Sequence, residues 1–348
     1  MFKKRSSSQA AIVGLDLDPG HIAAAEVTAN GSVSLKRGAV APLRPGILRD
    51  GEVADAAGLA ETLRGLFDEH DLPRRVRLGI ANQRIVVRTL DLPVLEDEKA
   101  LAAAVKVQAP DHIPMPMDEA VLDWQSLGNV TNAAGQERTR VVVVAVRREM
   151  VEKLAGAARE AGLSVEGIDL SAFGMVRALA DRKVTGAVLY VSVAGLTNVA
   201  VANSSGCLFT RAAAGGLDAM VNTLAERRGL TAEHSRQWMQ HVGLHAPLEG
   251  VDGDPDLVAA ARAVLEDGVH QLADTVRNSL NFYRMQESAE QVEQGVLTGP
   301  AVAIPGFVEA LSEQLRLPLS PAVVATDDDE ADVGRLTVAA GLAVEDIA

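Results

Sequence analysis

The sequence is short of cysteine, aromatic residues and positive charge. Cys207 is the single cysteine among 348 residues, which excludes an intramolecular disulfide and a zinc site built on several thiolates. With 33 Lys and Arg against 47 Asp and Glu, the formal net charge is −14, and only 2 Trp, 2 Tyr and 6 Phe are present. Nucleic-acid binding relies on clustered positive charge or on aromatic stacking platforms. The composition therefore argues against a nucleic-acid partner.

Long uninterrupted apolar runs are also missing. The stretch 184–210 carries no charged residue, but polar residues interrupt it at Ser192, Thr197 and Asn198, and β-branched Val is frequent. A membrane-spanning helix needs about 20 predominantly apolar residues. We therefore read the stretch as buried strands joined by tight turns. The basic N-terminus, 3–5, has no long apolar segment behind it and predicts no signal peptide.

An internal repeat is the most informative feature. Strands are predicted at 11–16, 22–27 and 33–37, with Asn30-Gly31 suited to a type I′ hairpin turn. The same order of strands and turns returns at 188–193, 197–202 and 207–211, so that Asp16 and Ser192 take equivalent places 176 positions apart. A duplication of such long period predicts two similarly built halves.

Mixed helices and strands follow each trio, which predicts an α/β protein. Helices are expected at 54–68, 96–109, 150–161, 172–180, 217–228, 232–241, 255–286, 307–315 and 333–343. Pro110 is expected to stop the second of these, Gly162 to end the third, and Ser171 to cap the fourth. Further strands are expected at 76–81, 85–90, 121–127, 140–146, 165–170, 296–298 and 322–325, with a polar loop at 129–138.

Three segments make the resemblance to a known family specific. The stretches 108–125, 145–151 and 279–287 resemble the PilM family, the actin-like cytoplasmic assembly proteins of type IV pili, and the likeness runs from about 11 to 347. It implies the duplicated actin-like (ribonuclease H-like) ATPase fold, with two lobes around a central cleft. The first lobe would span 10–180, with a small inserted subdomain at about 76–146, and the second 181–348.

The resemblance also implies a nucleotide site. In the superfamily the nucleotide lies in the cleft, against the two hairpin turns and a Gly-rich turn near the end. Matched to this sequence, the nucleotide-binding candidates are Asp16, Asp18, Gly20, Ser192, Gly195, Gly215, Gly216 and Gly299. The implied cofactor is ATP with Mg²⁺, and Asp16 is the candidate to hold the metal.

The turns depart from the family pattern in ways that disfavour hydrolysis. Asp18 stands for a glycine, Pro19 for a serine, Ala23 for a lysine, Ser192 for an aspartate and Pro300 for a glycine. A phosphate cradle needs backbone N–H donors and positive charge, whereas proline lacks a donor and Asp18 adds negative charge that only a bridging Mg²⁺ would offset. Hydrolysis, nucleotide binding without turnover, and a purely structural cleft all remain open, with turnover the least favoured. In the structural case Asp16 only accepts turn hydrogen bonds.

A partner site is the second implication of the resemblance. In PilM-like proteins the inserted subdomain helps to form a groove for the short cytoplasmic tail of PilN, an inner-membrane protein. The candidates here are Arg88, Ile113, Pro114, Met115 and Trp124, each with core packing as the alternative. We expect a cytoplasmic adaptor at the inner face of the membrane, touching the membrane only through its partners, with self-association left open. The alternative functions are an active actin-like ATPase and an FtsA-like membrane-associated filament protein.

Overall fold

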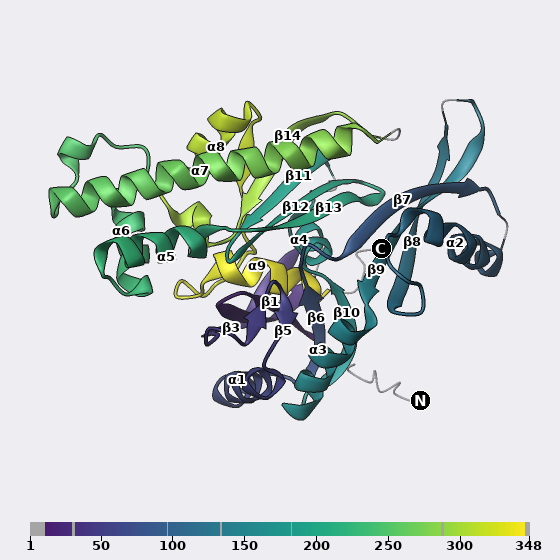
Figure 1. The fold of residues 1–348 in the computed structure, drawn as a ribbon, viewed down its shortest axis with the longest axis horizontal. Coiled ribbons are helices and arrows are strands. Elements are labelled where there is room, and N and C mark those ends of the chain that lie inside the picture. Colours follow the sequence, from purple (N-terminus) through teal and green to yellow (C-terminus); the bar gives the residue numbers. More distant parts are fainter. Residues whose placement is uncertain are drawn as a thin grey trace, which may run out of the picture.

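The computed structural model describes residues 11–29, 32–95, 97–132, 134–181, 183–286 and 289–344. Within them the chain forms two five-stranded sheets, a three-stranded sheet and surrounding helices (Figure 1). The predicted Asn30-Gly31 turn and the N-terminal basic cluster lie outside the described residues.

The first sheet has the strand order β10-β6-β1-β2-β3. Its strands are β1 (Val13–Asp18), β2 (His21–Ala29), β3 (Val33–Pro42), β6 (Arg75–Ile80) and β10 (Ser164–Leu170). β1 pairs antiparallel with β2 and parallel with β6. Helices α1 (Ala56–Glu69) and α3 (Arg148–Glu160) cover its outer face, and a small hairpin, β4 (Leu48–Arg49) and β5 (Glu52–Val53), precedes α1.

The second sheet repeats this topology in the order β13-β12-β11-β14-β15. Its strands are β11 (Ala187–Val193), β12 (Leu196–Asn203), β13 (Gly206–Ala214), β14 (Val292–Thr298) and β15 (Leu319–Pro321). Its helices are α5 (Leu217–Arg228), α6 (Ala232–Val242), α7 (Pro255–Arg284) and α8 (Phe307–Leu315), with short 3-10 turns at Leu248–Gly250 and Pro300–Ala303. The matching strand orders confirm the predicted duplicated, two-lobed α/β fold.

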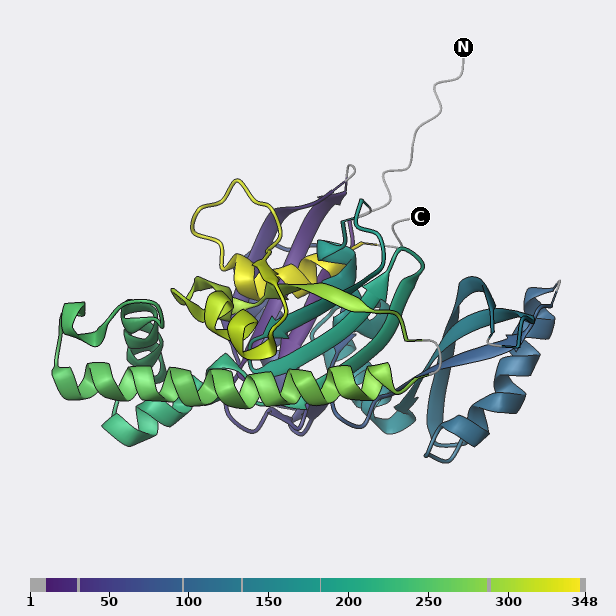
Figure 2. The same cartoon turned by 90° about the horizontal axis from the view of Figure 1, so that it is seen from above.

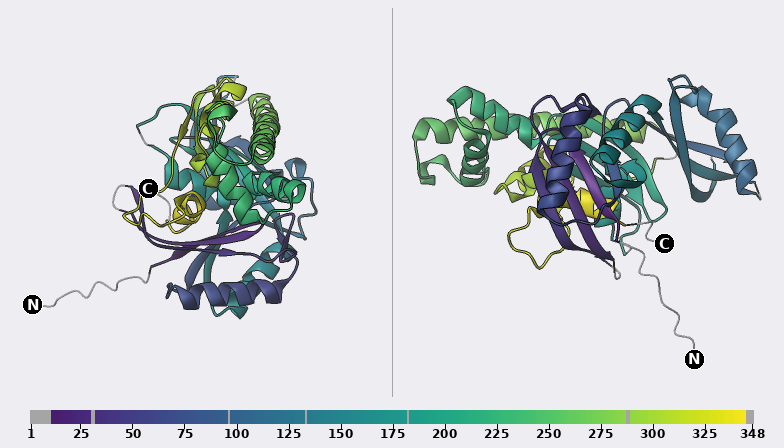
Figure 3. Two further views of the ribbon diagram at one scale, coloured as in Figure 1. Left: turned by 90° about the vertical axis from the view of Figure 1, so that its left-hand side faces the viewer. Right: turned by 90° about the horizontal axis from the view of Figure 1, so that it is seen from below.

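Helices α4 (Ser171–Leu179) and α9 (Val333–Leu342) lie between the two sheets (Figures 1 and 3). α9 is buried from Gly334 to Leu342, as expected for an enclosed helix that is apolar apart from Arg335 and Thr337. It comes from the C-terminal half of the sequence, yet it packs on β1, β2 and β3 of the first sheet, through Leu336, Ala339 and Ala340. The closing helix thus ties the two halves together.

The third sheet forms a separate unit at one end of the molecule (Figure 2). It consists of β7 (Val86–Pro93), β8 (Ala120–Thr131) and β9 (Glu137–Arg147) in the order β7-β9-β8, with α2 (Glu98–His112) on one face. We call this unit, 86–147, the insert. The expected boundary at 76 differs from the structure, because β6 pairs with β1 and β10 in the first sheet.

Several local expectations were wrong. Pro110 does not stop α2, which continues to His112: the proline lacks only its own N–H donor, and the Ile113 N–H still donates to the Ala109 carbonyl. The loop expected at 129–138 is shorter than predicted, because β8 continues to Thr131 and β9 begins at Glu137. The strand expected at 322–325 reduces to a single bridge between Ala325 and Ser34, with β15 placed just before it. Ser171 does not cap α4 but is its first residue.

Glycine makes the crossing of α4 and α9 feasible. A Cβ added at Gly341 would lie 1.7 Å from the carbonyl oxygen of Gly174, which cannot yield without moving a helix. We expect Gly341→Ala to lower the free energy of unfolding by about 3 kcal/mol, at the upper end of overpacking costs. Urea denaturation measures it. The matched control is Gly65→Ala in α1, where nothing lies within 4 Å and alanine should stabilise the helix by about 0.5–1 kcal/mol. Equal effects of the two substitutions would contradict this account.

Candidate functional site

Two hairpin turns, one from each sheet, meet in the cleft between the lobes. The β1–β2 turn carries Asp18, and the β11–β12 turn carries Gly195. The Asp18 carboxyl accepts a hydrogen bond from the Gly195 N–H at 2.5 Å and another from the Leu196 N–H at 2.9 Å. A Cβ at Gly195 would lie 2.5 Å from the Pro19 carbonyl oxygen. The turns are therefore in direct contact, and the Asp18 carboxyl accepts the hydrogen bonds that two amides of the facing turn donate.

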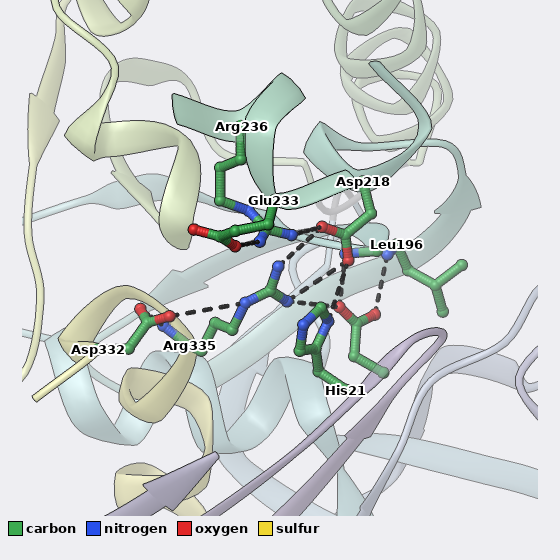
Figure 4. A network of polar contacts seen from close by, with 9 residues as sticks. His21, Leu196, Asp218, Glu233, Arg236, Asp332 and Arg335 are labelled. Carbon is green, nitrogen blue, oxygen red and sulfur yellow. Dashed lines mark hydrogen bonds and ion pairs between the residues drawn. The ribbon is translucent and has the colours of Figure 1, made fainter. Parts of the chain in front are cut away.

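A charged network surrounds this contact (Figure 4). Arg335 of α9 places its guanidinium 2.7 Å from one oxygen of Asp218, at the start of α5, and 4.0 Å from Asp18. His21 and Arg236 lie 3.5 and 3.3 Å from Asp218. Burial on its own raises the pKa of Asp218, but the nearby His21 ring and the charge of Arg335 hold that pKa well below its ordinary value. We call these five residues the clasp; they join both lobes and the closing helix.

Asp16 lies beside the clasp, and its surroundings raise its pKa. Its carboxylate accepts a hydrogen bond from the Ser171 hydroxyl at 2.6 Å. Burial raises its pKa to about 6, although Ser171 opposes the shift. Burial and the nearby charge of Asp16 likewise raise the pKa of Asp18 to about 8, against the two amide donors. Ionising this pair inside the cleft is costly.

The raised pKa of Asp16 predicts a pH-dependent stability. A carboxyl whose pKa is higher in the folded chain stabilises it fully below the unfolded value near 4, and that contribution is lost as the pH rises through about 6. We expect Asp16→Asn, which keeps the shape, to gain about 2 kcal/mol relative to the wild type between pH 4.5 and 7.5. Denaturant titrations at a series of pH values measure this. Parallel pH curves for the two proteins would show that Asp16 titrates normally.

The remaining nucleotide candidates converge on the same place. Ser192 pairs with Thr298 on β14, just as Asp16 pairs with Gly79 on β6. Three of the expected glycines have positive φ, namely Gly20 at 95°, Gly215 at 85° and Gly299 at 94°. A Cβ at Gly216 would lie 2.3 Å from the Ala194 carbonyl oxygen, and one at Gly299 would lie 2.6 Å from the Val193 carbonyl oxygen. Asp16 and Ser192 therefore lie in strands β1 and β11, and the other six candidates lie at the turns between the lobes or next to them.

Whether these residues suit MgATP is decided by the space and donors they leave. The cavity among Asp16, Asp18, Ser192 and Arg335 is about 10 Å³, about the space of one water molecule. The Gly195 and Leu196 amides are already engaged, and Arg335 is paired with Asp218. Among the residues that the structure describes, no three His, Cys, Asp or Glu side chains are grouped to hold a metal. In this arrangement the site does not fit a triphosphate with Mg²⁺.

A much larger cavity lies elsewhere, between the insert and the first lobe. It measures about 690 Å³. We call it the groove. Its apolar lining comes from β9 and β8 of the insert and from β10, α3 and α4 of the lobe: Val121, Val142, Val144, Val146, Val151, Ile168 and Phe173. Arg77, Arg177, Asp123 and Asp169 add charge to it.

Residues of β9 alternate between the two faces of the insert sheet. Val141, Val143 and Ala145 pack under α2, whereas Val142 and Val144 line the groove. The unbroken Val141–Val144 run is the sequence signal for this, since a strand that is apolar on both faces needs a cover on each.

The five partner candidates lie mostly on the α2 side of the insert sheet. Trp124 borders the groove, but it pairs in register with Val143 and packs against the core under α2. Ile113 is only 4% exposed and packs in the core under α2, with Met115 partly buried against that core. Pro114 is exposed beside them, and Arg88 pairs in register with Val143 and donates to the Val87 carbonyl. Of the five, Trp124 alone is among the residues around the groove, and none of them supplies its aliphatic wall.

Within the described residues, no helix combines the length and the apolar character that crossing a bilayer requires. The uncharged stretch 184–210 forms β11, β12 and most of β13, as expected for buried strands.

Comparison with solved structures agrees with this geometry. The chain is 25% identical to a protein in the structure titled "PilM-PilN type IV pilus biogenesis complex", with 96% of this chain and 98% of that chain covered and a TM-score of 0.76. The ethanolamine utilization protein EutJ of Carboxydothermus hydrogenoformans is 14% identical (95% and 88% covered, TM-score 0.56). MreB5 of Spiroplasma citri, solved with AMPPNP, is 12% identical (96% and 95% covered, TM-score 0.54). These last two show the fold alone.

The sequence also matches a family model. The model of the type IV pilus assembly protein PilM matches residues 14–329, nearly the whole chain. The chain therefore belongs to the PilM family of type IV pilus assembly proteins.

Proposed function

We propose that this protein is an adaptor of the inner-membrane platform that assembles type IV pili, and that it binds the cytoplasmic tail of a PilN-like membrane protein. The family supports the pilus role, and the solved PilM–PilN complex, 25% identical to this chain, supports the partner. The protein would act at the cytoplasmic face of the membrane and reach it through that partner.

The groove is the observation that carries this proposal. Its volume is in the range that holds a short ligand segment, and its lining is largely aliphatic, with Phe173 beside it. It also lies between two strands that end their sheets, β8 of the insert and β10 of the first lobe. An extended tail can pair with such an edge and place alternate side chains against the apolar wall.

Docking, and not ATP turnover, is the activity we assign to the protein. The cleft holds a clasp in place of an open phosphate site, and Ser192 replaces the second carboxylate that would orient a metal or water. We infer that partner binding does not depend on nucleotide hydrolysis.

A binding titration tests the function. The full chain is titrated into a fluorescent peptide of the PilN-like tail, and anisotropy is recorded with and without 2 mM MgATP. We expect saturable one-to-one binding that MgATP leaves unchanged and that a scrambled peptide does not show. Absence of binding would refute the adaptor role, and binding only in the presence of MgATP would refute its independence from nucleotide.

A further inference from the structure

The mismatch between the fold and its cleft has a specific cause in this chain. Two backbone N–H groups, at Gly195 and Leu196, point to one position from the second hairpin turn. The Arg335 guanidinium and the His21 ring lie beside that position. Consecutive amides with a cation nearby form an anion site in proteins generally. The group in that site here is the carboxyl of Asp18.

We propose that Asp18 is a built-in occupant of the anion site between the hairpin turns, so that the chain closes its cleft with its own side chain instead of a nucleotide phosphate. The two carboxyl oxygens take one amide each, at 2.5 and 2.9 Å. Asp18 comes directly before the Pro19-Gly20 turn, which brings it across to the other lobe.

Covalent attachment makes this occupant hard to displace. A tethered group competes at an effective concentration in the millimolar range or above, whereas a free ligand must also supply the entropy of immobilisation. The clasp adds to this, because Arg335 also holds Asp218 at 2.7 Å, on the helix that follows the Gly215-Gly216 turn. The ligand that Asp18 excludes would be a phosphate group of a nucleoside triphosphate.

The close packing of the turns agrees with a cleft closed from within. The Pro19, Ala194 and Val193 carbonyl oxygens all lie less than 3.0 Å from where a Cβ would stand on Gly195, Gly216 and Gly299. The space left is about 10 Å³. Removing one carboxyl side chain would free both amides at the point where the lobes touch.

Three variants test the proposal. Asp18→Gly removes the occupant, Asp18→Asn keeps its shape but cannot ionise, and Asp327→Gly removes a carboxylate from an exposed loop as the matched control. Binding of Mg-AMPPNP and of inorganic pyrophosphate is measured by calorimetry and by the shift in melting temperature. We expect no binding by the wild type or Asp327→Gly up to 1 mM. For Asp18→Gly we expect a dissociation constant at least tenfold lower than this limit. We expect Asp18→Asn to bind these ligands as weakly as the wild type does.

Two results would overturn the proposal: micromolar binding of Mg-AMPPNP by the wild type, or a folded Asp18→Gly protein that binds no better than the wild type. If Asp18→Gly does not fold, the proposal is tested instead by amide hydrogen exchange of the nucleotide-free wild type. Slow exchange at Gly195 and Leu196 is expected, and fast exchange at both would contradict occupancy by Asp18. Binding of the tail peptide is measured in parallel. Loss of that binding would contradict the adaptor role but would leave the proposal for Asp18 standing.

Discussion

Replacing Arg335 by alanine should lower the free energy of unfolding by about 3–5 kcal/mol. Arg335 is 7% exposed, and its guanidinium lies 2.7 Å from Asp218 and 4.0 Å from Asp18. Removing one member of a buried ion pair strands the other charge without water to solvate it. Here the substitution would leave Asp218 with only the longer contacts from Arg236 and His21, at 3.3 and 3.5 Å, while Asp16 and Asp18 stay nearby.

Urea denaturation at pH 7 measures this effect. The control is Arg277→Ala, which breaks an exposed pair with Asp274 on α7 and should cost less than about 0.5 kcal/mol. A loss for Arg335→Ala as small as that of the control would show that the clasp does not hold the lobes together.

Introducing a charge into the groove, by Val121→Asp, should weaken binding of the tail peptide by at least about 100-fold. Val121 is half-buried on the edge strand β8 and lines the groove. In the free protein the new carboxylate stays in water. Binding of an apolar tail would bury it without a partner, which costs several kcal/mol and weakens the binding. Anisotropy with the labelled peptide measures the loss, and a melting curve checks that the fold is retained.

Val107→Asp is the matched control for this variant. Val107 is 76% exposed on α2, on the opposite side of the insert sheet, and the same change there should leave the affinity within about twofold. Equal losses from both variants would place the tail away from the groove. Retained affinity in a folded Val121→Asp protein would exclude the groove as the site.

The duplicated fold was predictable because its signals are local. Strand trios with Gly and Pro turns repeat along the chain, and the equivalence of Asp16 and Ser192 is matched by their pairing with Gly79 and Thr298 on corresponding strands. The convergence of the candidate turns followed from the same repeat. The limits of the insert were less predictable, because β6 and β7 look alike as sequence and only their pairing partners separate them.

The charges that close the cleft were not predictable in the same way. Asp218 and Arg335 are 117 positions apart, and nothing near either residue indicates the other. Asp218 offered one hint, since it follows Gly215-Gly216 in the first turn of α5. Ser171 was misread for a similar reason: its residue type favours a helix cap, but a carboxylate 155 positions earlier takes its hydroxyl instead.

The contact between Ser171 and Asp16 has a consequence for the groove. Ser171 is the first residue of α4, and Phe173 and Arg177 of that same short helix line the groove. The same short helix therefore contacts Asp16 through its first residue and the groove through its later residues. A change in the contact between Asp16 and Ser171 therefore acts on the same helix that supplies part of the groove wall.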